Sequence, residues 1–150
     1  MLIEVVSKGG NLLLNVGPTG RGEFDERALQ RLRGMGEWMR RHARSIYGCT
    51  AAEAGVPTPK DCRLTWNPQT NRLYVHIFAW PYKQLSLDGL AGKVEYAQLL
   101  NDASEVFLHE PSAQQMEMGG ADAGAVTLDL PVERPNVDIP VVELFLKSNR

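Results

Sequence analysis

The hydrophobic pattern of this chain changes its period near residue 50, and this change constrains the fold more than any other feature. Before it, apolar residues recur every three or four positions, as they do on one face of a helix. From Cys62 onward they recur at every second position, as they do on a strand. The sequence therefore predicts two dissimilar parts, the first containing helices and the second rich in strands.

The first part has the pattern of a piece of an α/β fold. Residues 2–7 are predicted to end a helix, with Gly9 and Gly10 as its C-terminal cap. Leu12–Val16 is a short apolar run without alternation, which is typical of a strand buried on both faces of a parallel sheet. A helix is expected from Asp25, whose carboxylate can cap its first turn. A lone parallel strand has no neighbour to pair with, so we expect the chain to enter this fold partway through.

The second part predicts an antiparallel β-sandwich. The clearest strand is 72–80, with Leu73, Val75 and Ile77 on one face and Tyr74 and His76 on the other. Both faces are apolar or aromatic, so this strand is expected to be central. Further strands are predicted at 63–66, 84–87, 93–99, 105–109, 126–130 and 141–146, and a long loop at 113–125.

Charge and composition argue against several classes of partner and cofactor. The chain has 150 residues, with 16 Lys and Arg against 18 Asp and Glu, so no basic surface is expected for nucleic acid. It has no apolar run of about 18 residues, the length that a membrane span requires. Its three histidines are scattered, and Cys49 and Cys62 have no ligand spacing, so neither a metal nor another cofactor is predicted. The two cysteines are expected as reduced thiols, with a disulfide as the alternative.

One long motif resembles a known family. Residues 5–18, VVSKGGNLLLNVGP, closely resemble a stretch near the end of the catalytic barrel in the α-L-fucosidases of glycoside hydrolase family 29. The resemblance continues at 36–38 and 45–48, and more weakly at 139–144. It implies a (β/α)8-like barrel followed by a C-terminal β-sandwich. Residues 1–50 would then be the last strand and helix of the barrel, and residues 51–150 the sandwich domain.

The resemblance also implies a function for the whole enzyme. The family is retaining, with an Asp nucleophile and a separate acid/base carboxyl group, which stand about 5 Å apart in such enzymes. Both would lie upstream of the segments present here, so no catalytic residue is assigned. The chain is expected to brace the barrel, to meet a fucosylated glycan only through the whole enzyme, and to be inactive alone.

Three residues are candidates for substrate contact, one in the expected barrel strand and two in the loop that follows it. Asn15 lies near the C-terminal end of that strand, where barrel enzymes build their sites, and Pro18 and Thr19 follow in the next loop. For Asn15, the alternative is hydrogen bonding to backbone groups inside the barrel.

Two other functions remain open from the sequence. A stand-alone carbohydrate-binding sandwich would present exposed aromatic side chains as a platform. A purely structural module could associate through the unpaired run 12–16, giving a homodimer. Localisation also stays open, because 1–6 is too short and too polar for a signal peptide, while the resemblance is compatible with an exported or periplasmic parent enzyme.

Overall fold

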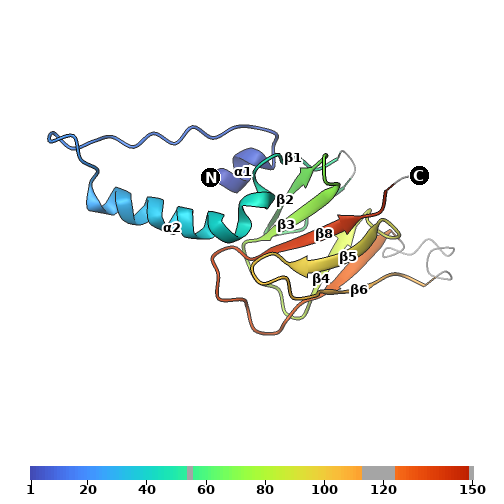
Figure 1. The fold of residues 1–150 in the computed structure, drawn as a ribbon. Helices are drawn as coiled ribbons and strands as arrows, with labels where there is room; N and C mark the ends of the chain where they lie inside the picture. Colours follow the sequence, from blue (N-terminus) through green and yellow to red (C-terminus); the bar gives the residue numbers. More distant parts are fainter. Residues whose placement is uncertain (54–55, 113–123, 149–150) are drawn as a thin grey trace.

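The computed structural model describes residues 1–53, 56–112 and 124–148, which form a β-sandwich with a helical N-terminal part attached to it (Figure 1). One sheet has five strands in the order β1-β2-β3-β8-β5, and the other has three in the order β4-β7-β6. All neighbouring strands pair antiparallel. The strands are β1 Thr50–Ala51, β2 Cys62–Asn67, β3 Arg72–Ile77, β4 Gln84–Asp88, β5 Val94–Leu99, β6 Phe107–His109, β7 Ala125–Asp129 and β8 Val141–Leu146.

The predicted sandwich is confirmed, including the central place of the strand that begins at Arg72. That strand ends at Ile77 and not at Trp80. The loop predicted at 113–125 lies outside the described residues except for its last two positions, and Ala125 already begins β7.

Alternation along the strands builds the hydrophobic core between the two sheets. Leu73, Val75 and Ile77 of β3 all belong to this core, together with Val126 and Leu128 of β7. The intervening side chains of β3, Tyr74 and His76, are buried as well, on the opposite face of the sheet. This second buried face exists because the helical part covers it.

The helical part consists of α1 (Leu2–Val6), α2 (Glu26–His42) and the short 3-10 helix η1 (Ala43–Ser45). The predicted cap of α1 is present: Gly9 has a φ of 76°, and the N–H of Gly10 donates to the carbonyl of Val5 at 2.9 Å. The predicted cap of α2 is present too, because Asp25 accepts a hydrogen bond from the N–H of Arg27 at 2.8 Å. The C-terminal end of α2 lies against the sandwich, and its N-terminal end projects away from it (Figure 1).

The strand predicted at Leu12–Val16 does not form. These residues are extended but belong to no strand, and Leu13 is 93% exposed. The physical reason is that a parallel strand needs a neighbour for its backbone groups, and the described residues supply none at this position. No helix in the described part of the chain is long and apolar enough to cross a membrane.

Candidate functional site

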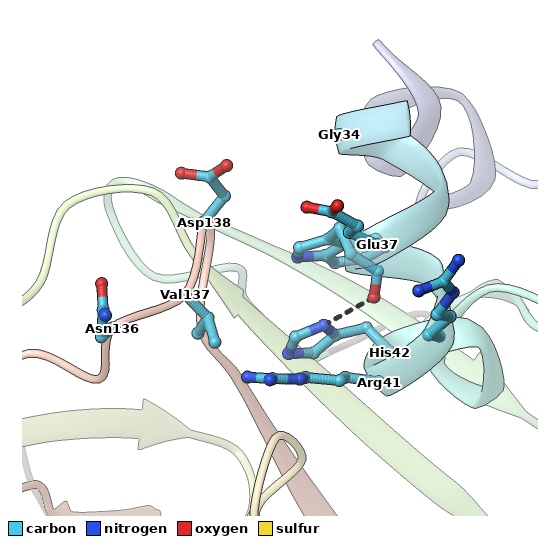
Figure 2. A pocket seen from close by; sticks show the side chains of 9 residues that line it. Gly34, Glu37, Arg41, His42, Asn136, Val137 and Asp138 are labelled. Carbon is cyan, nitrogen blue, oxygen red and sulfur yellow. Dashed lines mark hydrogen bonds between the residues drawn. The ribbon is translucent and has the colours of Figure 1, made fainter. Parts of the chain in front are cut away.

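The helical part and the sandwich meet at a cleft beside the C-terminal half of α2 (Figure 2). We call this contact region, between α2–η1 and the outer face of the five-stranded sheet, the junction. The cleft has a volume of about 450 Å³ and is open to solvent. Figure 2 shows Glu37, Arg41 and His42 of α2 on one side, with Val137 and Asp138 on the other.

Two buried histidines lie at the junction, and one of them, His42, lines this cleft. His42 stacks on the indole of Trp38, with ring centroids 4.7 Å apart, and the His76 ring lies 6.2 Å from the same indole. His42 Nδ1 is 2.9 Å from the carbonyl oxygen of Trp38. Since a carbonyl only accepts, this contact places the His42 proton on Nδ1 and leaves Nε2 as an acceptor.

The second histidine belongs to a hydrogen-bonded chain that ends on η1. The hydroxyl of Thr65 donates to the carbonyl of Ser45 at 2.7 Å, so it accepts from His76 Nε2, at 2.9 Å. His76 Nδ1 and His42 Nε2 are both buried acceptors without a partner in the described part of the chain. The two imidazoles therefore face a region where a proton would be poorly stabilised.

Burial sets the charge state of both histidines. Removal from water, and after it the charge of the neighbouring His42, lowers the pKa of His76 to about 3. Burial also lowers the pKa of His42, against the carbonyl contact to Trp38, which raises it. Both rings are neutral at neutral pH, and His76 is too weak a base to abstract protons there.

A buried carboxylate forms the second polar contact of the junction. Glu143 on β8 is 4% exposed, and its Oε2 accepts from Arg44 Nη2 at 2.9 Å and from Gln98 Nε2 at 2.7 Å. Its Oε1 accepts from the hydroxyl of Tyr74 at 3.2 Å. Burial, and next to it the Glu143 charge, raise the pKa of Tyr74, which keeps this hydroxyl protonated as a donor. Arg44 thus ties η1 to the central strands of the sheet.

Two further contacts complete the attachment of the helical part. Trp38 Nε1 donates to the carbonyl of Ile139 at 3.3 Å, across the edge of the cleft. Glu4 of α1 forms an ion pair with Arg63 of β2. Two hydrogen bonds lower the pKa of Glu4. The one from Lys8 is the largest cause, and the one from Arg63 comes next.

The three candidate substrate-contact residues lie elsewhere. Asn15, Pro18 and Thr19 are all exposed on the segment before α2, and none of them lines the cleft. Thr19 closes a turn at the projecting end of α2: its N–H donates to the carbonyl of Glu23 at 2.7 Å. The structure therefore does not bring these residues together with the junction, and their proposed contact with substrate stays a prediction.

The described residues offer little for acid–base chemistry or metal binding. Four carboxyl groups in this part of the chain have shifted pKa values, those of Glu4, Asp25, Asp102 and Asp129, and each is lowered. A general acid in a glycosidase needs a raised pKa instead. No group of three or more potential metal ligands occurs in the part of the chain that the structure describes.

Sequence reasoning missed the histidine pair, which it took as scattered. The signals were present: His42 lies one helical turn after Trp38, and His76 lies on the same face of β3 as Tyr74, turned away from the sandwich core.

The two cysteines agree with the prediction of reduced thiols. Cys49 and Cys62 are free, and burial raises the pKa of each to about 11, so both are protonated and unreactive at neutral pH.

Comparisons with known proteins agree on one family. The family model described as Alpha-L-fucosidase matches residues 1–44. The plasma α-L-fucosidase of Homo sapiens is 37% identical over 82 residues, covering 53% of this chain and 17% of the human protein. The solved structure of α-L-fucosidase isoenzyme 1 from Paenibacillus thiaminolyticus is 36% identical and superposes with a TM-score of 0.81, covering 97% of this chain and 33% of that one. The solved structure of a Thermotoga maritima α-fucosidase is 27% identical and superposes with a TM-score of 0.71. This match covers 95% of this chain and 32% of that one.

The fold and these matches define the chain as a region related to the glycoside hydrolases. More particularly, its matches are to α-L-fucosidases, so the α-L-fucosidase resemblance found in its sequence is confirmed. Its antiparallel β-rich fold matches that of the fucosidase structures over nearly its whole length. The chain spans 17% to 33% of the length of the human and Paenibacillus relatives.

Proposed function

We propose that this chain acts as the C-terminal region of an α-L-fucosidase-like retaining glycoside hydrolase, where it braces the catalytic barrel. Residues 1–50 would contribute the last strand and helix of the barrel, and residues 51–150 the sandwich. The fucosylated glycan would be bound by the whole enzyme, with Asn15, Pro18 and Thr19 as the candidate contacts from this chain.

The observation that carries this proposal is the contrast between the two sides of the helical part. Toward the sandwich, α2 and η1 are held by buried contacts of Thr65, His76 and Glu143. On the other side, Leu13 is 93% exposed and Leu14 is 40% exposed, within the motif shared with fucosidases. An uncovered apolar segment next to a well-packed helical part is what we expect when the partner of that segment is the rest of a barrel.

The first experiment tests the chain alone. Purified protein is incubated with 4-nitrophenyl α-L-fucoside, and release of nitrophenol is followed by absorbance. We expect no turnover, because no carboxyl group with a raised pKa occurs among the described residues. Sustained hydrolysis by the pure chain would show that it holds a catalytic pair of its own and would overturn the proposal.

The second experiment tests bracing directly. This chain replaces the matching third of the Paenibacillus thiaminolyticus enzyme, whose identity of 36% makes the barrel contacts comparable. We expect the chimaera to hydrolyse the same fucoside, and the chimaera with Leu13→Asp to lose most of that activity. A Val132→Asp chimaera is the control, because Val132 is 60% exposed and lies outside the helical part. If the chimaera without substitutions folds but is inactive, the bracing role is contradicted.

A further inference from the structure

The three-stranded sheet turns a polar outer face to solvent, on the layer of the sandwich away from the junction. Leu85, Leu87, Val126 and Leu128 point into the core, so Gln84, Thr127 and Asp129 alternate outward. Phe107 and His109 of β6 are exposed on the edge strand, with Phe107 paired to Asp129 across the ladder. Contact with a barrel on the junction side does not account for aromatic side chains exposed here.

An exposed tyrosine, Tyr82, lies beside this face, in the loop just before β4 begins. Tyr82 is 75% exposed and lines a shallow surface depression of about 640 Å³ together with Lys83, Gln84, Asp129, Leu130 and Val132. The ammonium of Lys83 lies 5.2 Å from the centre of the Tyr82 ring. Aromatic, aliphatic and hydrogen-bonding groups thus meet in one small area.

The loop that carries Tyr82 is fixed by backbone contacts. Lys83 has a φ of 63°, a left-handed conformation that is uncommon for a residue other than glycine. Its carbonyl accepts from the N–H of Leu130 at 2.7 Å, and the N–H of Gln84 donates to the carbonyl of Tyr82 at 2.8 Å. Trp80 Nε1 donates to the carbonyl of Pro131 at 3.0 Å. An aromatic ring presented on a fixed loop loses little conformational entropy when a ligand stacks on it.

The polar groups beside Tyr82 are held in place but keep free bonding capacity. Gln84 Nε2 donates to Asp129 Oδ1 at 3.0 Å, and His109 Nε2 contacts Asp129 Oδ2. The hydrogen bonds from His109, the larger cause, and from Gln84 lower the pKa of Asp129, so its carboxylate stays ionised. A carboxylate has about four acceptor positions and an amide has two donors and an acceptor, so both can still bond to ligand hydroxyl groups.

We propose that the depression beside Tyr82 binds a neutral saccharide as a site separate from hydrolysis. The C–H face of a pyranose ring would stack on Tyr82, and its hydroxyls would bond to Gln84 and Asp129. Hydroxyl groups donate and accept, which suits an amide next to a carboxylate. The opposite charges of Lys83 and Asp129 balance within the depression, which favours a neutral ligand over an anion. This proposal rests on the proposed function only for the choice of fucosylated probes.

The test is a titration of the full ¹⁵N-labelled chain, followed by chemical shifts, with methyl α-L-fucopyranoside, methyl β-D-galactopyranoside and 2′-fucosyllactose. We expect saturable shifts at 82–84 and 127–130, with a Kd of about 1 mM because the depression is shallow. Tyr82→Ala should weaken binding about tenfold or more. Gln84→Ala should weaken it less, because Asp129 can still accept from the sugar.

The matched control is Tyr47→Ala, which removes another exposed tyrosine, 70% accessible, at the junction side. It should leave the affinity unchanged. Absence of saturable shifts with all three saccharides, or equal losses from Tyr47→Ala and Tyr82→Ala, would overturn the site. Because the chimaera assay measures bracing and this titration measures binding by the chain alone, each proposal can fail without the other.

Discussion

Burial keeps both junction histidines neutral, and this makes the stability of the chain depend on pH. The pKa of His76 is about 3 in the folded chain, against 6.5 for an ordinary histidine, and that of His42 is lowered as well. Below pH 6.5 the unfolded chain therefore binds protons that the folded chain does not. The contribution of the two neutral histidines to the free energy of unfolding is complete above pH 6.5. It is lost as the pH falls toward 3.

We predict that the free energy of unfolding falls by about 1.4 kcal/mol per pH unit for each fully shifted histidine over this window. Urea denaturation at several pH values between 7.5 and 5 measures the slope, above the range where carboxyl groups titrate. His76→Gln keeps an N–H that can donate to Thr65 but removes the proton-binding group, so the slope should be shallower. An unchanged slope in His76→Gln would refute the prediction.

Glu143 provides the second prediction at the residue scale. Its side chain is 4% exposed and accepts three hydrogen bonds, so Glu143→Ala leaves the buried hydroxyl of Tyr74 without its acceptor. We expect a loss of about 2 kcal/mol in the free energy of unfolding, the usual cost of leaving a buried polar group without its hydrogen-bond partner. Arg44 adds little to this cost because its side chain is 54% exposed. Urea unfolding of this variant is compared with Glu95→Ala, which removes an exposed carboxylate on the neighbouring strand β5. Equal effects of the two variants would show that the Glu143 contacts do not stabilise the junction.

At the scale of elements, the strands and α2 could be predicted from the sequence because their signals are local. Alternation along β3 assigns Leu73 and Val75 to the core, and Asp25 marks the start of α2 through its own side chain. The residues at 12–16 differ because a parallel strand is defined by its neighbours, and the apolar pattern of the segment contains no information about whether they are present. The same applies to the junction, since His42 and His76 are 34 positions apart and meet only through the packing of α2 on the sheet.

The position of Asn15 shows the same limit for the candidate site. Its proposed role depends on a strand at 12–16, and in this chain that segment forms no strand and Asn15 is exposed. Pro18 and Thr19 are better defined, because Pro18 pairs with Phe24 and Thr19 with Glu23 in a turn before α2. A loop with its own hydrogen bonds can form without the barrel, whereas a barrel strand cannot.

At the scale of the whole molecule, the uncovered segment 12–16 predicts self-association of the isolated chain. Leu13 is 93% exposed, and the segment makes no ladder with the described strands of its own sandwich. Extended backbone with apolar side chains and free N–H and C=O groups is a template for pairing with a second copy. We therefore propose that the chain alone forms a homodimer through 12–16, whose mass analytical ultracentrifugation measures.

Substitution separates this contact from unspecific association. Leu13→Asp introduces a charge that cannot be buried without a large desolvation cost, so it should shift the chain to monomer. Val132→Asp, at a site 60% exposed on a loop outside the helical part, should leave the dimer intact. In the chimaeric enzyme the barrel should cover the segment 12–16, so the chimaera without substitutions should not dimerise through it. Leu13→Asp should lower the activity of the chimaera. A monomeric isolated chain, or a dimer that Leu13→Asp leaves unchanged, would show that the segment is not the contact between copies.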